Sequence, residues 1–203
     1  GGGLFIEQNS NPTINNSIIK GNQSLNGGGG IYVWANSSPT FETLEISNNS
    51  ATYRGGGIHV GNSNCSINNV TFFGNTSGGD GGGGINMESG ANITIINSIL
   101  YGNTPEQIRF HDVSDQNSIT ISYSDIEGGE NGIETNENGT IYWEEGNIDS
   151  DPLFCNADNN NFTLYDNSPC VGTGENGANM GALGVGCSGG PYSGPVWHVS
   201  TTG

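Results

Sequence analysis

Residues 28–54 of the chain read GGGIYVWANSSPTFETLEISNNSATYR. A glycine triplet followed by an apolar residue occurs four times, and the apolar residue returns every 27 positions, as Leu4, Ile31, Ile58 and Ile85. A fixed period of this length indicates a repeat protein in which each unit stacks on the next. The unit is too short for a propeller blade and has no helical period, so we predict a coil of short strands.

A second series of residues repeats in step with the glycine triplets. It consists of Asn22, Asn49, Asn75 and Asn103, at intervals of 27, 26 and 28 residues. Aligned asparagine amides can hydrogen-bond turn backbone and one another, so we expect a structural ladder. The triplets are expected at coil corners, where positive φ and close backbone approach disfavour a Cβ atom.

Apolar residues alternate within each unit and predict three inward-facing stacks. The first stack pairs Leu4/Ile6, Ile31/Val33, Ile58/Val60 and Ile85/Met87, the second holds Ile14, Phe41, Ile67 and Ile95, and the third holds Ile19, Ile46, Phe72 and Leu100. Isoleucine outnumbers leucine 20 to 7, a β-branched bias that favours strands. We therefore predict an all-β chain with a thin core and coils about 4.8 Å apart.

The charge of the chain limits its partners. Three Lys and Arg residues against 20 Asp and Glu residues give a formal net charge of −17. Such a surface repels nucleic-acid phosphates and anionic lipid headgroups, so we expect neither as a partner. No apolar run approaches the roughly 20 residues that span a bilayer, so we expect no membrane insertion.

The repeated motifs resemble a known family. GGGI-x-V, then NSSPTF-x-x-L-x-I, then SNN or GNT is similar to the right-handed parallel β-helix repeats of secreted and cell-surface bacterial proteins, including the polymorphic-outer-membrane-protein type. The resemblance covers residues 1–154 and implies a right-handed parallel β-helix solenoid of about six coils. The motifs DPLFC (151–155), FTLYDNSPC (162–170) and MGALGVGC (180–187) resemble the closing segment of such domains.

These features predict the organisation of the chain. Residues 1–107 form regular coils, and 108–154 form irregular coils, because the glycine triplet is lost and the step from Ile85 to Ile108 is 23. Residues 155–188 form an irregular C-terminal cap that carries a disulfide. Residues 189–203 form a Gly/Pro linker and a strand-like tail, Val196, Trp197, His198 and Val199, which resembles the opening strand of another β-helix domain. We expect this tail to pair with a copy of the chain or a neighbouring β-helix domain.

Four cysteines are present, and their spacing does not suggest zinc. Cys65 falls at a strand position equivalent to Pro12, Pro39 and Ile93, so we expect a buried free thiol. Cys155, Cys170 and Cys187 lie in the cap and allow three single pairings. We favour Cys155 with Cys187, in an oxidising compartment.

Outward positions of the first strand in each coil form a candidate carbohydrate-binding surface. Its residues are Tyr32, Trp34, His59, Glu88, Arg109 and His111. Aromatic rings beside carboxylates and amides can stack on sugar faces and hydrogen-bond their hydroxyls. The alternative is that these rings cover a strand face.

Catalysis is the other function that parallel β-helices suggest, because the fold resembles polysaccharide lyases and pectin hydrolases. A lyase needs a strong base beside carboxylates that hold Ca²⁺, and only Lys20, Arg54 and Arg109 are available. A hydrolase needs two carboxylates about 5 to 9 Å apart, and acids are sparse in the regular coils. We assign no catalytic residue; a groove with Arg54 or Arg109 beside two carboxylates would favour an enzyme.

Acidic residues concentrate between Glu106 and Asp151. Oxygen-rich clusters suit Ca²⁺ at extracellular concentrations, and Asp149 and Asp151 are the candidate ligands. The alternative is a solvated acidic face, and no cofactor is required. The sequence thus favours a non-catalytic, secreted structural or adhesive module, expected to be a repeat unit of a larger surface protein or of a head-to-tail filament. Its candidate partners are copies of itself, neighbouring β-helix domains and extracellular glycans. A polysaccharide-binding or polysaccharide-degrading domain is the alternative.

Overall fold

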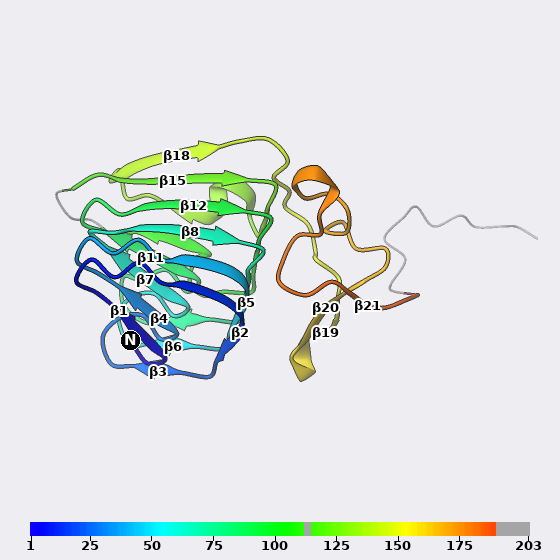
Figure 1. The fold of residues 1–203 in the computed structure, drawn as a ribbon, viewed down its shortest axis with the longest axis horizontal. Helices are drawn as coiled ribbons and strands as arrows, with labels where there is room; N and C mark the ends of the chain where they lie inside the picture. Colours follow the sequence, from blue (N-terminus) through cyan, green and yellow to red (C-terminus); the bar gives the residue numbers. More distant parts are fainter. Residues whose placement is uncertain (112–114, 190–203) are drawn as a thin grey trace, which may run out of the picture.

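The computed structural model describes residues 1–111 and 115–189. Figure 1 shows parallel strands stacked in successive coils, with the C-terminal segment along one side of the stack. The predicted all-β parallel solenoid is confirmed. The predicted tail, Val196 to Val199, lies outside the described residues.

The first sheet contains the strand that follows each glycine triplet. Its order is β1-β4-β7-β11-β14-β17, and every pairing is parallel. The six strands are separated by five turns of the solenoid, against the about six coils expected. They span β1 (Leu4–Ile6), β4 (Ile31–Val33), β7 (Ile58–Gly61), β11 (Ile85–Glu88), β14 (Ile108–Phe110) and β17 (Ile133–Glu134).

The second sheet forms the opposite walls of the solenoid. Two long strands cover both walls in the early coils, and later coils divide the same path between two shorter strands. The strands are β2 (Thr13–Lys20), β5 (Thr40–Ser47), β8 (Asn64–Asn68), β9 (Thr71–Phe73), β12 (Asn92–Ile96), β13 (Ile99–Tyr101), β15 (Asn117–Ser122), β16 (Asp125–Ile126) and β18 (Gly139–Trp143). A short third sheet contains β3 (Gln23–Ser24), β6 (Ser50–Ala51) and β10 (Thr76–Ser77).

The asparagine series forms a continuous hydrogen-bonded ladder along the solenoid. Each of Asn49, Asn75 and Asn103 accepts, through its side-chain oxygen, the backbone N–H and the amide N–H of the preceding asparagine at 2.8–3.0 Å. The glycine triplets lie beside this ladder at a coil corner. A Cβ atom on Gly29 would lie 2.4 Å from the Gly56 carbonyl oxygen, which explains why the triplet tolerates no side chain there.

The core is a narrow column of stacked apolar residues. The inward positions of β4, β7 and β11 are completely buried, as are Phe41, Ile46 and Phe72 of the other two stacks. The registers place Ile14 beside Phe41 and Ile19 beside Ile46, as the repeat predicts. Cys65 is buried and free within the same column.

The C-terminal segment lies along the flank of the solenoid (Figure 1). We call residues 154–187 the strap. It contains β19 (Phe154–Asn156), β20 (Asn161–Tyr165) and β21 (Val185–Cys187), with 3-10 helices η2 (Ala157–Asn159) and η3 (Glu175–Gly177). Phe73 at the end of β9 contacts Phe154 and Phe162, with ring centroids 5.6 and 4.8 Å away. Outward residues of the coils therefore anchor the strap.

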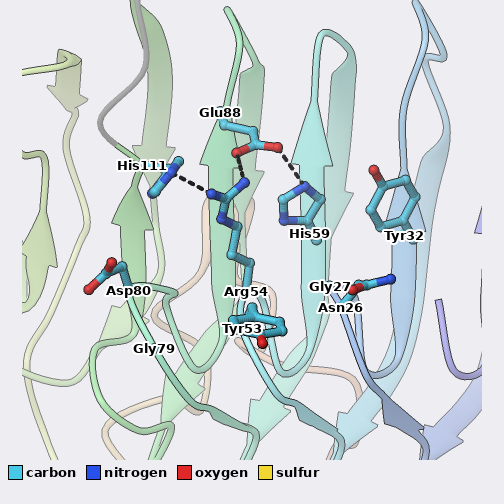
Figure 2. Close-up of a pocket in the computed structure, with 10 residues that line it drawn as sticks. All are labelled: Asn26, Gly27, Tyr32, Tyr53, Arg54, His59, Gly79, Asp80, Glu88 and His111. Atoms are coloured by element: carbon cyan, nitrogen blue, oxygen red, sulfur yellow. Dashed lines mark hydrogen bonds and ion pairs between the residues drawn. The ribbon is translucent and has the colours of Figure 1, made fainter.

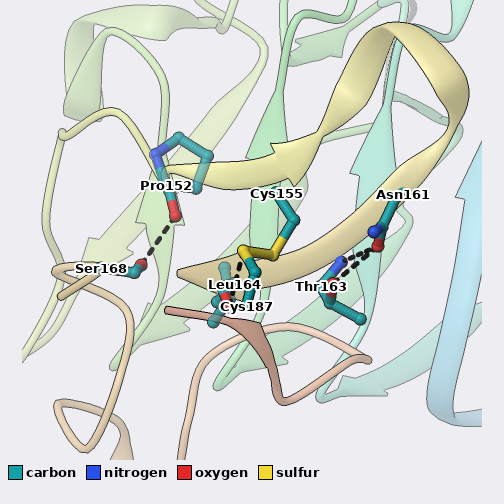
Figure 3. Close-up of a disulfide and its surroundings, with 7 residues drawn as sticks. All are labelled: Pro152, Cys155, Asn161, Thr163, Leu164, Ser168 and Cys187. Atoms are coloured by element: carbon teal, nitrogen blue, oxygen red, sulfur yellow. Dashed lines mark hydrogen bonds between the residues drawn. A yellow bond between two sulfur atoms is a disulfide. The ribbon is translucent and has the colours of Figure 1, made fainter. Parts of the chain in front are cut away.

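A disulfide ties the two ends of the strap together. Cys155 on β19 is joined to Cys187 on β21, with Cα atoms 6.1 Å apart (Figure 3). This is the pairing favoured from the sequence. Cys170 stays free and is buried between the strap and the solenoid.

The described residues contain little helix. A third 3-10 helix, η1 (Gly129–Gly132), leads into β17. No helix within residues 1–111 and 115–189 has the length and apolar character needed to cross a membrane.

Candidate functional site

A pocket opens on the outward side of the first sheet, where loops from three coils meet its strands. Its volume is about 490 Å³. Asn26, Tyr53 and Asp80 form its loop side, and they lie 27 residues apart, at the same position of three successive units. Figure 2 shows the lining residues, which are Asn26, Gly27, Tyr32, Tyr53, Arg54, His59, Gly79, Asp80, Glu88 and His111.

An aromatic column forms one wall beside this pocket. Phe5, Tyr32 and His59 occupy equivalent positions of β1, β4 and β7, and their rings stack with centroids 5.1 and 4.9 Å apart and interplanar angles of 8° and 12°. Each ring covers part of its neighbour, and His59 is only 2 % exposed. Much of the ring surface expected to bind sugar is therefore used in packing between coils.

Trp34 packs against the column and lies outside the pocket lining. Its ring is nearly parallel to those of Tyr32 and His59, with centroids 6.0 and 6.1 Å away. The indole crosses Gly61 of the next coil, where a Cβ atom would overlap the ring. Tyr32 and Trp34 therefore share one face of the first sheet, but of the two only Tyr32 lines the pocket.

The floor of the pocket is a hydrogen-bonded charge cluster. The Arg54 guanidinium donates through Nη1 to Glu88 Oε2 at 2.6 Å, and His59 Nε2 lies 3.2 Å from Glu88 Oε1. Burial raises the pKa of Glu88, but the pKa still lies below its usual value, because Glu88 accepts a hydrogen bond from His59 and lies beside the Arg54 guanidinium. Glu88 is therefore held ionised at the floor.

Hydrogen-bond partners also indicate which ring nitrogens of the two histidines in the cluster donate and which accept. The Asn86 amide lies 3.3 Å from His59 Nδ1, and its oxygen accepts the Gly82 N–H, so the amide nitrogen donates to Nδ1 and Nε2 donates to Glu88. Arg54 Nη2 lies 2.6 Å from His111 Nε2. Because arginine can only donate, this His111 nitrogen accepts. Both imidazoles are therefore neutral in this arrangement.

Tyr32 contributes a protonated hydroxyl to the pocket. Burial and the nearby Glu88 carboxylate raise the pKa of its phenol above the usual value. At neutral pH the phenol is therefore available both as a hydrogen-bond donor and as an acceptor.

The remaining predicted site residues lie elsewhere. Arg109 pairs with Glu106 at 2.9 Å and is not among the pocket residues. Asp149 accepts the Gly128 N–H, and Asp151 accepts the Leu153 N–H. Among residues 1–111 and 115–189, no group of three or more His, Cys, Asp or Glu side chains is placed to hold a metal ion. Asp149 and Asp151 thus serve as turn acceptors in this structure.

Sequence reasoning missed Asn26, Tyr53 and Asp80, and it considered Arg54 only as a lyase base. The signal was present, because the 27-residue period that aligns the glycine triplets also aligns Asn26, Tyr53 and Asp80. Strand alternation does not mark these three residues, because they lie in the loops that precede each glycine triplet. Loops on a rigid scaffold are where binding residues concentrate.

Comparison with known proteins supports the assignment of the fold. The family model described as right handed beta helix region matches residues 1–168. Comparisons with curated proteins and with solved structures each returned no match. The family match covers all six strands of the first sheet and the pocket that they carry. The chain therefore belongs to the right-handed β-helix family.

Proposed function

We propose that this chain is a non-catalytic, extracellular adhesive module that binds saccharide in the pocket beside the aromatic column. The observation that carries the proposal is the mixed lining of the pocket. Carboxylate, amide, guanidinium and phenol groups converge there from successive coils. Sugar hydroxyls both donate and accept hydrogen bonds, so this set of groups is chemically matched to them.

Tyr53 supplies the apolar contact in this proposal. Its side chain lines the pocket and is 57 % exposed, whereas His59 is buried in the column. An exposed ring at the edge of a polar pocket can stack on the C–H face of a sugar. Tyr53 therefore takes the role that the sequence analysis gave to Tyr32 and Trp34.

The same pocket also answers the criterion stated for an enzyme, since it holds Arg54 beside Glu88 and Asp80. The geometry supports binding better than catalysis. Both terminal nitrogens of Arg54 are engaged by Glu88 and His111, which suits a fixed donor and not a base. Glu88 is held ionised, whereas a glycosidase acid must keep its proton until the bond breaks.

The extracellular setting rests on the disulfide and on the family resemblance. Cys155–Cys187 is a structural disulfide, and such bonds persist in oxidising compartments. A rigid solenoid that presents a pocket on its side is suited to hold a glycan at a surface.

A glycan array tests the proposal directly. The wild-type chain is expected to bind a defined subset of saccharides, and Tyr53→Ala should weaken that binding at least tenfold. Tyr142→Ala is the matched control, because Tyr142 is similarly exposed, at 51 %, but lies on β18 away from the pocket lining. Absence of saccharide binding, or equal loss in both variants, would contradict the proposal. Release of shortened saccharide, detected by mass spectrometry, would favour the enzyme alternative.

A further inference from the structure

The charge of the pocket points to the kind of saccharide that it takes. Its arginine is already neutralised, because Arg54 and Glu88 form an ion pair at 2.6 Å and Glu88 is 6 % exposed. Asp80 adds a second carboxylate at the exposed rim. With both histidines neutral, the lining holds one positive charge against two negative charges.

Among the described residues, no other lysine or arginine lines this pocket. Of the other two Lys and Arg residues, Lys20 is exposed on β2, and Arg109 is paired with Glu106. Neither lines the pocket. The chain as a whole carries a formal charge of −17, so its long-range field also repels anions.

The hydrogen-bonding groups of the pocket match hydroxyls better than anions. An anionic oxygen needs donors alone, whereas Asp80 offers only acceptors and Asn26 offers both. Arg54 is fixed by Glu88 and His111, so its remaining N–H groups are oriented donors whose charge is balanced. The pocket therefore offers both donors and acceptors, as a neutral sugar does.

We propose that the pocket selects uncharged saccharides and rejects uronate- or sulfate-bearing ones, with the Arg54–Glu88 pair as the selecting element. The inference rests on the proposed function, because it names the ligand class of the same site. Glu88 acts here as a positioning residue: it fixes Arg54 and cancels its charge without itself needing to contact the ligand.

The test is an array of matched neutral and acidic oligosaccharides, such as mannan with mannuronan and xylan with glucuronoxylan fragments. The wild-type chain is expected to bind only neutral members, with little dependence on salt concentration, since no net charge is neutralised on binding. Binding of acidic members as strong as that of the neutral ones would overturn the inference and leave the proposed function standing. Binding of neither kind would overturn the proposed function itself.

Two variants test whether charge sets the selection. Glu88→Gln keeps the size of the side chain and an oxygen for Arg54 but leaves the guanidinium uncompensated, so binding of acidic oligosaccharides should appear and should weaken with added salt. Asp80→Asn changes only the exposed rim; it should weaken neutral binding about tenfold and lower the ratio of neutral to acidic binding.

Asp158→Asn provides the control, because it removes the same charge from an exposed position in η2 of the strap. It should leave both kinds of binding unchanged. If Glu88→Gln folds, as judged by circular dichroism and thermal melting, and still rejects acidic saccharides, the ion pair is not the selecting element. If Glu88→Gln does not fold, the ratio measured with Asp80→Asn decides: an unchanged ratio overturns the inference.

Discussion

Gly61 shows how a single missing Cβ shapes the surface beside the pocket. The Trp34 indole of the preceding coil lies over this glycine, and a Cβ atom would come within 1.8 Å of the ring. The indole must therefore move if any side chain is placed there. Because the ring also packs against Tyr32 and His59, its displacement disturbs the aromatic column.

We predict that Gly61→Ala lowers the free energy of unfolding by about 1–3 kcal/mol, the usual cost of overpacking. The emission of Trp34 should shift at the same time, because its ring leaves the stack. Chemical denaturation and tryptophan fluorescence measure the two effects. Gly184→Ala is the control, since a Cβ atom there has only an ordinary contact at 3.7 Å. Equal stability of the two variants would contradict the packing seen at Gly61.

A second residue-scale feature is the bend between the two walls of the second sheet. Asn16, Thr43, Asn69, Asn97 and Tyr123 occupy equivalent bends, and all have positive φ, between 46° and 54°. Asparagine tolerates this left-handed region, whereas β-branched residues such as threonine are strained there. Thr43 therefore carries a local cost that its asparagine neighbours in the stack avoid.

Thr43→Asn should consequently stabilise the chain by about 1 kcal/mol. The comparison is Thr40→Asn in the same strand, β5, where Thr40 is not among the residues with positive φ. That change should be neutral or destabilising, because asparagine is disfavoured in strands. Thermal or chemical unfolding checks both. A loss of stability in Thr43→Asn would show that the bend is not strained.

At the scale of the element, the asparagine ladder is the clearest source of register between coils. Asn75 is completely buried, and its side chain bonds to Asn49, Asn103 and the Ile46 carbonyl. Removing that amide leaves several buried polar groups without a partner. Asn22, in contrast, is half-buried and donates only to Asn49.

Asn75→Ala should therefore cost about 3–5 kcal/mol, because each buried group left unsatisfied costs about 1–3 kcal/mol. Asn22→Ala should cost about 1 kcal/mol or less, since its backbone N–H still reaches Asn49. Urea denaturation of the two variants measures the difference. Similar losses at the two positions would contradict this. They would mean that the asparagines stabilise the chain through their preference for turns and that the buried hydrogen-bond network contributes little.

The 27-residue period predicts which residues form the strands, but it does not predict how the outward side chains pack against one another. It places Ile31, Ile58 and Ile85 in register. Ile108, which follows after an irregular step, still pairs with Ile85 in a parallel strand. Alternation in a strand determines which face a side chain leaves from, so the outward position of Tyr32 was predictable. The stacking of its ring with Phe5 and His59 depends on rotamers and neighbours in other coils, which the pattern does not encode.

The strap shows the same limit at the next scale. The pairing of Cys155 with Cys187 was favoured from the sequence, but the strap itself does not repeat. Its place is set by contacts with outward residues such as Phe73 and Asp125, which no period marks as special. The sequence pattern therefore predicts how the coils stack, but it does not predict that the strap lies along the flank of the solenoid.

At the scale of the whole molecule, the strap is held to the solenoid around a buried acid. Asp125 on β16 is completely buried; it accepts the Ser150 N–H at 3.1 Å and contacts the Cys170 thiol at 3.2 Å. Ile99, Leu164 and Met180 form a small apolar cluster with Cys170. An ionised carboxylate at this contact loses its solvation, so burial there favours the protonated carboxylic acid.

Burial raises the pKa of Asp125 from 3.8 to about 6, and the nearby Asp149 and Asp151 carboxylates add to the rise. The Ser150 and Cys170 hydrogen bonds oppose it without cancelling it. Because the folded value is the higher one, the protonated acid favours the folded state. The contribution of Asp125 to the free energy of unfolding is therefore fully present below about pH 4 and is lost as the pH rises through 6.

Asp125→Asn, which resembles the protonated acid, should remove this dependence. We predict that wild-type stability falls relative to Asp125→Asn by about 2.5 kcal/mol between pH 4 and pH 7, because the folded and unfolded pKa values differ by about two units. Urea denaturation across this range measures the difference, and hydrogen exchange should show the strap amides losing protection first in the wild type. Asp158→Asn, at an exposed strap position, should track the wild type. If the stabilities of wild type and Asp125→Asn instead change in parallel with pH, Asp125 titrates as an ordinary acid and the strap is held by its apolar contacts and disulfide alone.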